Sequence, residues 1–281
     1  MPARARRPGL AFLYAVPIGL LGGFMGLGGA EFRLPVLAGP LRYSARQAVP
    51  PNLAISLVTL AVALLTRGRT LSFASLISLL PAIGALMTGA VITAFIGPAM
   101  ASGLSEERLE RVILVFLVCI GLALMIAGFL PQTLPALLPN TLPRHIGAGV
   151  VFGLVIGLVS SLLGVAGGGL IIPTLVFAFG ADIKTAGTGS LLISLPTVIV
   201  GVLRYASGGA FTDHQALTET VVPMSVGSLI GAVAGGMLVG IIPASLLKIG
   251  LGMMLNVSAV RIFYRTHATP GSDTSRAEQK G

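Results

Sequence analysis

The sequence predicts an all-α integral membrane protein that is built from two homologous halves. Three observations predict this class: a hydrophobic composition, long apolar runs and an internal repeat. Of the 281 residues, 54% are hydrophobic and 10% are charged, whereas roughly a quarter of the residues in a soluble domain are charged. So few charges cannot cover the surface of a soluble protein of this length. Lipid is therefore the expected solvent for most of the chain.

Long apolar runs define the expected spans, because a spanning helix needs about 20 mostly apolar residues. Eight runs qualify: 10–30, 47–66, 73–96, 110–130, 146–166, 187–206, 218–241 and 244–264. Two shorter apolar pieces, at 32–41 and 168–181, lie between spans. They are too short for straight spans and too apolar for ordinary loops. Each half is therefore expected to hold about four full transmembrane helices and one Gly/Pro-broken half-helix.

The chain repeats itself at an offset of 138 positions. The match starts at Gly19 and Gly157 and needs no gap through Thr59 and Thr197. It includes several positions that are not simply apolar: Pro35 with Pro173, Arg46 with Lys184, Asn52 with Ser190, and Ser56 with Ser194. Farther on, "GAV" at 89–91 aligns with "GAV" at 231–233 if a few residues are inserted. Such agreement predicts a duplication.

The predicted segments are a basic N-terminal segment at 1–9, a first repeat at 10–130, a linker at 131–145, a second repeat at 146–265 and a disordered tail at 266–281. Halves with four spans would be parallel, and halves with five crossings would be inverted. The positive-inside rule, which treats Arg67 as a loop residue, scores the two arrangements almost equally. Both place the two termini in the cytoplasm. We favour inverted halves, because broken helices and inverted repeats occur together in secondary transporters.

Charge and cysteine content exclude several partners. The net charge of +9 fits basic loops that orient helices, and no basic run is interleaved with aromatic residues, so no nucleic acid is expected. The single cysteine, Cys119, excludes an intramolecular disulfide and a multi-cysteine metal site. None of the three histidines has a second ligand at a suitable spacing. We expect neither a metal nor another cofactor.

Two glycine clusters lie where helices are expected to break. They comprise Gly26, Gly28 and Gly29 in the first half, and Gly164, Gly167, Gly168 and Gly169 in the second. Non-helical backbone at membrane depth occurs only where protein or a wet cavity surrounds it. The half-helix after a break offers unpaired N–H groups and the positive end of its dipole, which together favour an anion. We expect the two breaks to face each other near the midplane.

Scattered glycines have a simpler explanation. Small residues let helices pack closely in a membrane. We prefer this interpretation for five positions: Gly84, Gly89, Gly227, Gly231 and Gly235.

Charged residues near the breaks are candidate binding, coupling or steering groups. Glu31 and Arg33 follow the first break, and charges within a span are rare and usually functional. Arg33 is a candidate anion ligand and Glu31 a candidate carrier of a coupled proton. The alternatives are mutual pairing, or an arginine that reaches for the interface. Arg46, Lys184 and Arg204 lie at ends of spans, where they could steer an anion or anchor a helix.

Polar residues of the repeat are candidate cavity-lining groups. Asn52, Ser56 and Thr59 lie on one face of a helix. The same face recurs in the second half with Ser190, Ser194 and Thr197, and Thr188 belongs to the same group. These side chains would supply neutral hydrogen bonds to an anion. The alternative is hydrogen bonding between helices.

A family resemblance adds to these patterns. The stretch "GVAGGGLIIPTLVFAFGADIKTAGTGSLLISLPT" resembles the second-half motif of the TauE/SafE sulfite exporter family, also called the four-toluene-sulfonate uptake permease family. "GLGGAEFRLPVL" and "SARQAVPPNLAIS" in the first half are looser copies. The resemblance covers essentially the whole chain. It implies transport of small sulfur-containing or organic anions such as sulfite, sulfonates, sulfoacetate or thiosulfate. Glu31 and Arg33 depart from the pattern, because glycine or apolar residues usually follow the first break in this family.

The patterns and the resemblance together predict a secondary transporter of a small anion in the inner membrane, whose halves rock around the two breaks. The chain has no nucleotide-binding P-loop, so coupling would come from a proton, another ion or a partner. An anion channel and a non-transporting scaffold subunit are the alternatives, and a second copy of the chain is a further candidate partner. A membrane enzyme is disfavoured, because few ionisable groups lie within the spans.

Overall fold

A computed structural model of the chain describes residues 7–43, 45–71, 74–100, 118–119, 121–129, 136–139, 141–163 and 165–267. These residues form helices and no strand. Five helices are long and apolar enough to cross a membrane: Pro8–Met25, Gln47–Thr70, Leu142–Ser161, Ile183–Ser207 and His214–Ile241. Shorter apolar helices include Leu80–Ile96 and Ala244–Val257. The predicted all-α membrane protein is confirmed, while the predicted span at 110–130 is described only at 118–119 and 121–129.

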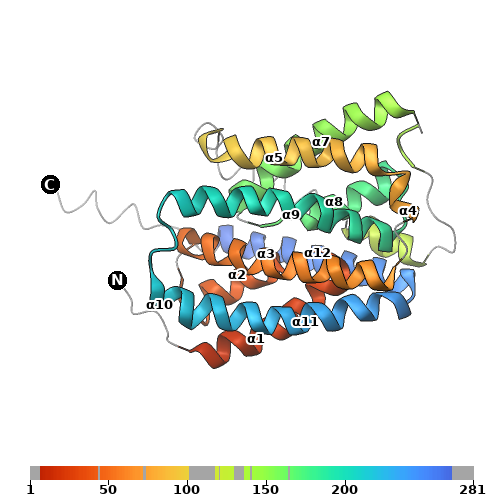
Figure 1. Cartoon of the computed structure of the whole chain (residues 1–281). Coiled ribbons are helices and arrows are strands. Elements are labelled where there is room, and N and C mark those ends of the chain that lie inside the picture. The colour runs from red at the N-terminus through yellow and green to blue at the C-terminus, as the bar shows by residue number, and fades with distance from the viewer. Residues whose placement is uncertain are drawn as a thin grey trace.

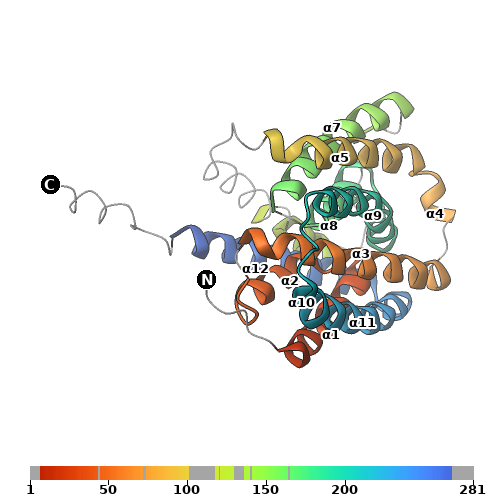
Figure 2. The ribbon, with the colours of Figure 1, turned by 60° about the vertical axis from the view of Figure 1, so that its left-hand side comes forward.

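The helices form a bundle in which most helix axes are roughly parallel or antiparallel (Figures 1 and 2). In chain order they are α1 (Pro8–Met25), α2 (Ala30–Ala38), α3 (Ala45–Thr70), α4 (Ala74–Ile77), α5 (Leu80–Met100), α7 (Leu142–Leu163), α8 (Gly168–Pro173), the π-helix η2 (Thr174–Ala178), α9 (Ile183–Ser207), α10 (His214–Ala216), the π-helix η3 (Leu217–Val221), α11 (Val222–Ile241) and α12 (Ala244–His267). Helix α7 begins at Leu142, within the predicted linker 131–145, and Pro143 lies in its first turn, where a proline is tolerated because its missing N–H would have no partner within the helix.

Both predicted breaks are present. Helix α1 ends at Met25 and α2 begins at Ala30, while α7 ends at Leu163 and α8 begins at Gly168. Gly26, Gly28, Gly29 and Gly167 have φ values of 86°, 73°, 74° and 75°. Residues with a Cβ rarely adopt this left-handed backbone, so the breaks depend on glycine.

Helices α3 and α9, which the predicted repeat aligns, run in opposite directions. Arg67 Nε, near the end of α3, donates to Gly23 O near the end of α1 at 3.1 Å, so α1 and α3 end together. Arg67 Nη1 also donates to Thr188 Oγ1 near the start of α9 at 3.3 Å, so α9 begins where α3 ends. Figure 1 shows α4, after α3, and α10, after α9, at opposite ends of the bundle. We call these the α4 end and the α10 end.

The first helix of each half packs on a helix of the other half. A Cβ added to Gly19 of α1 would lie 2.6 Å from the Ser228 Cα of α11, and one on Gly157 of α7 would lie 2.6 Å from the Ala90 Cα of α5. Ala90 and Ser228 are 138 positions apart, the same offset as Gly19 and Gly157. The two packing contacts thus correspond at the single offset of 138. An alignment of the two halves at these contacts does not need the insertion that the "GAV" match assumed. The duplication and its inverted relation stay predictions.

Most of the scattered glycines lie at close helix contacts. A Cβ on Gly227, Gly231 or Gly235 of α11 would reach the backbone of α1, and a Cβ on Gly89 of α5 would reach that of α7. Gly84 differs, because its Cβ would meet nothing within 4 Å. Close packing therefore does not explain Gly84.

Candidate functional site

The two breaks contact each other in the interior of the bundle. A Cβ on Gly168, at the second break, would lie 2.9 Å from the Leu27 Cα of the first break. The backbone N–H of Gly169 donates to Glu31 Oε1 at 3.0 Å. A carboxylate of the first half therefore already occupies an amide N–H that we predicted for a bound anion.

Arg33 of α2 is fully buried, at 0% exposure, and one of its terminal nitrogens points at α3. Arg33 Nη1 donates to Ser56 Oγ at 2.9 Å, to Asn52 Oδ1 at 3.1 Å and to Asn52 O at 3.3 Å. The Asn52 amide in turn donates to Ala30 O at 3.2 Å. The predicted polar face of α3 thus binds a side chain of its own half.

The other terminal nitrogen of Arg33 bonds again to α3 and also to two further elements. Arg33 Nη2 donates to Thr59 Oγ1 at 3.2 Å, to Gly28 O in the first break at 3.3 Å and to Ser228 Oγ of α11 at 3.5 Å. We call the groups that accept from Arg33 the Arg33 cage.

Every acceptor in the Arg33 cage is a neutral oxygen. Mutual pairing of Arg33 and Glu31 was one predicted alternative, but the two side chains have different partners. A buried charge is expensive unless it is paired or well hydrogen-bonded. The cage therefore holds a guanidinium by hydrogen bonds alone, and its positive charge is left without a carboxylate among these partners.

Arg67 is a second buried arginine, and sequence reasoning missed it. The predicted span stopped at residue 66, so Arg67 was treated as a loop residue, whereas α3 continues to Thr70 and Arg67 is 1% exposed. Besides its bonds to Gly23 and Thr188, it donates to Phe24 O at 2.8 Å and to Lys184 O at 3.5 Å. One signal in the sequence could have indicated that Arg67 lies within a helix. The offset of 138 aligns Arg67 with Tyr205, which belongs to the predicted span 187–206 of the second half.

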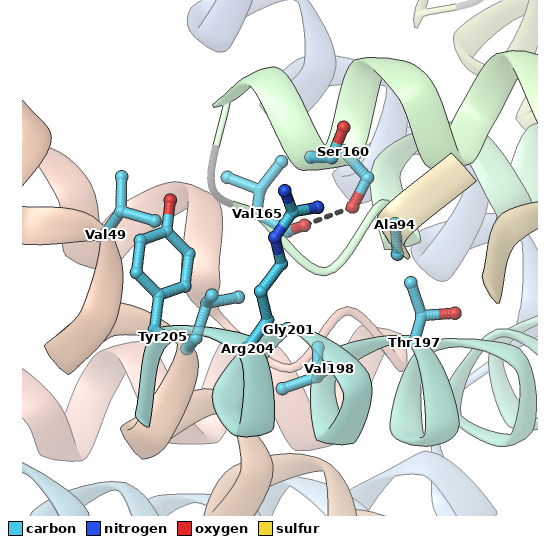
Figure 3. A pocket seen from close by; sticks show the side chains of 11 residues that line it. Val49, Ala94, Ser160, Val165, Thr197, Val198, Gly201, Arg204 and Tyr205 are labelled. Atoms are coloured by element: carbon cyan, nitrogen blue, oxygen red, sulfur yellow. Dashed lines mark hydrogen bonds between the residues drawn. The ribbon is translucent and has the colours of Figure 1, made fainter. Parts of the chain in front are cut away.

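A pocket lies between α3, α5, α7 and α9, beside the second break (Figure 3). Its cavity volume is about 30 Å³. Ser160 and Ser161 of α7 and Thr197, Arg204 and Tyr205 of α9 supply its polar groups. The remaining lining residues are Val49, Leu53, Ala94, Val165, Val198 and Gly201. No carboxylate is among them.

Arg204 carries the charge of this pocket. Figure 3 shows its guanidinium reaching across the pocket toward Ser160 and Val165 at the second break. Arg204 Nη1 donates to the backbone oxygen of Phe95 on α5, and its guanidinium lies 6.0 Å from the centre of the Phe95 ring. Ser160 Oγ donates to Val165 O, which fixes the turn that follows α7.

A polar stripe of α9 leads from the pocket toward the second break. Its members are Ser190, Ser194 and Thr197, which lie on one helix face because they are four and three positions apart. Thr197 Oγ1 donates to Ile193 O at 2.9 Å and Ser194 Oγ to Ala166 O at 2.8 Å. The Ser190 hydroxyl is buried and has no hydrogen-bond partner in the part of the chain that the structure describes.

The other predicted residues lie outside this pocket. Lys184 Nζ donates to Gly240 O at 3.3 Å near the α4 end, and Thr188 donates to Lys184 O at 3.0 Å. Gly26 packs against the backbone of Gly187, and Gly28 against the side chain of Leu60. Gly164 and the side chain of Arg46 lie outside the described residues. Among the residues that are described, no cluster of three or more His, Cys, Asp or Glu could hold a metal ion.

Fold and site together define a multi-pass helical membrane protein with a cationic pocket at a helix break. The family model for the sulfite exporter TauE/SafE matches residues 10–262. The chain therefore belongs to the TauE/SafE sulfite exporter family, which is a family of membrane transporters. No curated protein and no solved structure matches the chain.

Proposed function

We propose that the protein is a secondary transporter of a small sulfur-containing anion, such as sulfite, thiosulfate or a sulfonate. The observation that carries this proposal is the Arg204 guanidinium, which projects into a pocket beside the second break. A guanidinium matches the oxygens of an oxyanion with two parallel N–H groups. The residues that line the pocket supply hydroxyl groups and no carboxylate. An anion in the pocket would therefore meet hydrogen-bond donors and no negative charge.

The second break is a better anion site than the first. In the first half the polar face of α3 is engaged by Arg33. The position 138 residues after Arg33 is Ile171, whose aliphatic side chain cannot bond to the corresponding face of α9. This difference accounts for the partnerless hydroxyl of Ser190. A bound oxyanion would accept hydrogen bonds from Arg204 and from a hydroxyl of the pocket wall.

The proposed site is thus narrower than the two-break site predicted from the sequence. Arg204 and the pocket hydroxyls of Ser161, Thr197 and Tyr205 border the anion, while Gly28, Asn52 and Ser56 hold Arg33. Buried positive charge at Arg33 and Arg67, each bonded to neutral oxygens, would further favour an anion over a cation in the interior. Glu31, which bridges the breaks, is the candidate carrier of a coupled proton.

Opposite helix directions support alternating access. Inverted repeats exchange conformations when one half rocks against the other, so that a central site opens to each side in turn. Arg204 and Tyr205 of the pocket lie in the last turn of α9, so the pocket lies toward the α10 end, where α1 begins. With cytoplasmic termini, as the sequence predicts, the conformation described here would be open to the cytoplasm.

Binding to purified protein tests this function. Sulfite, thiosulfate, sulfoacetate, taurine and matched carboxylates would be screened by thermal shift, because a ligand that binds only the folded state raises the melting temperature. A shift with a sulfur anion that is lost in Arg204→Gln and kept in Arg69→Gln supports the site, since Arg69 is an exposed arginine of α3. A shift that survives Arg204→Gln would move the site elsewhere. No shift with any anion would contradict the proposed substrate class.

A further inference from the structure

The open pocket has a counterpart at the α4 end. Subtracting the offset of 138 from the pocket positions on α9 leads to positions on α3: Thr197 to Thr59, Val198 to Leu60, Gly201 to Ala63, and Tyr205 to Arg67. Val165 at the second break leads in the same way to Leu27 at the first break. If the halves moved alike, a pocket would be expected at both ends.

The counterpart is closed. Ala63 is 0% exposed, whereas its counterpart Gly201 is partly exposed. A Cβ on Gly201 would meet nothing closer than Leu53 Cδ1 at 3.4 Å. Gly187 is the counterpart of Val49, which lines the open pocket. A Cβ on Gly187 would lie 3.1 Å from Arg67 Nη2 and closer still to Nη1. The guanidinium of Arg67 therefore fills space whose equivalent is open at the α10 end.

Arg67 also ties together the elements that would have to separate. Its guanidinium connects α3 with the last turn of α1, through Gly23 O and Phe24 O, and with the first turns of α9, through Lys184 O and Thr188 Oγ1. In the open pocket, Arg204 makes no such connection between α3, α7 and α9, since its hydrogen bond goes to Phe95 of α5.

We infer that Arg67 is the gate that closes the α4 side of the transport path while the pocket at the α10 end is open. This inference rests on the proposed function, because a gate has a role only where two sides alternate. Opening the α4 side requires Arg67 to leave its carbonyl partners. All of these partners are neutral, so an anion that reaches the gate from the centre is a stronger partner for the guanidinium than the oxygens it leaves. Binding of the substrate anion to Arg67 would thus open the α4 side.

Cysteine accessibility tests the gate without any substrate. In a Cys119→Ser background, Ala63→Cys reports on the closed side and Gly201→Cys on the open pocket. A membrane-impermeant thiol reagent is added to one side of proteoliposomes at a time. With Arg67 present, Gly201→Cys is expected to react from the α10 side, and Ala63→Cys to react slowly from both sides.

Removing the gate should change this pattern with a defined sidedness. With Arg67→Ala, labelling of Ala63→Cys from the α4 side is expected to rise by about tenfold or more, because each lost hydrogen bond favours the open state severalfold. Labelling of Gly201→Cys should fall in the same protein, since the two sides alternate. Arg69→Ala is the matched control and should leave both rates unchanged. Arg67→Gln is measured in parallel, so that misfolding of one variant does not remove the test.

Two results would overturn the gate. One is an unchanged rate for Ala63→Cys in both Arg67 variants, and the other is a rise from the α10 side instead. Both are distinct from failure of the proposed function, which would appear as absent anion binding while the sided labelling persisted.

Discussion

The Glu31 carboxylate accepts a hydrogen bond from the Gly169 backbone at 3.0 Å, and these two residues are 138 positions apart, the offset of the sequence repeat. An axis that relates two halves must pass beside a pair whose members are each other's counterparts. If such an axis relates the two halves, this contact lies beside it. It also joins the two breaks directly, through one charged and one backbone group.

Gly169→Ala should disturb this contact in a way that depends on Glu31. The new Cβ would lie 2.8 Å from Glu31 Oε1, so the carboxylate must shift and its hydrogen bond weakens. We expect a stability loss of about 1 kcal/mol, typical of a hydrogen bond in a membrane protein, and no loss in a Glu31→Ala background. Thermal unfolding of the four proteins in detergent measures the coupling. Equal losses in both backgrounds would refute it.

Arg33→Met should destabilise the protein far more than the same change at an exposed arginine. The substitution removes the charged donor to Asn52, Ser56 and Thr59, and a hydrogen bond to a charged group contributes about 1.5–3 kcal/mol. We expect a loss of about 3 kcal/mol or more, compared with about 0.5 kcal/mol or less for Arg69→Met. Chemical or thermal unfolding checks the difference. Similar melting temperatures for the two variants would show that the Arg33 cage contributes little.

Ser190→Ala should leave both stability and anion binding intact. The Ser190 hydroxyl has no partner among the described residues, so its removal should leave the melting temperature unchanged or raise it. Anion affinity should also stay unchanged, because Ser190 lies about 21 Å from Arg204 along α9 and does not line the pocket. Ser194→Ala is the counterpart, because its hydroxyl donates to Ala166 O and its loss should lower stability. A loss of anion affinity in Ser190→Ala would contradict a site at Arg204.

Gly231→Ala and Gly84→Ala should have opposite effects. A Cβ on Gly231 would lie 2.6 Å from the Leu20 backbone nitrogen and closer to Val16 O, so α11 and α1 must move apart. Overpacking of this kind typically costs about 1–3 kcal/mol. Gly84 faces open space, so alanine there should be neutral or stabilising by up to about 1 kcal/mol from helix propensity. Melting temperatures of the two variants decide this, and a neutral Gly231→Ala would contradict the close packing.

Local sequence signals were enough to predict the class of helical membrane protein and the positions of the two helix breaks. Apolar runs predicted the helices, and the clusters around Gly28 and Gly168 predicted where they break, because left-handed backbone favours glycine. The partners of Arg33 were not predictable, since Ser228 lies 195 positions away and a repeat does not say which side chains meet. Arg67 was missed because hydropathy ends a span at its first charge, while a buried arginine can satisfy its donors with carbonyl oxygens from other helices.

Anion exchange in proteoliposomes tests the central claim, that a small anion passes through the pocket beside the second break. Vesicles loaded with unlabelled sulfite or thiosulfate would be mixed with the labelled anion outside. The account predicts uptake that the internal anion accelerates, that falls by about tenfold or more in Arg204→Gln, and that is unchanged in Arg69→Gln. Conductance without accelerated exchange would contradict a carrier, and full exchange in Arg204→Gln would contradict the pocket as the anion path.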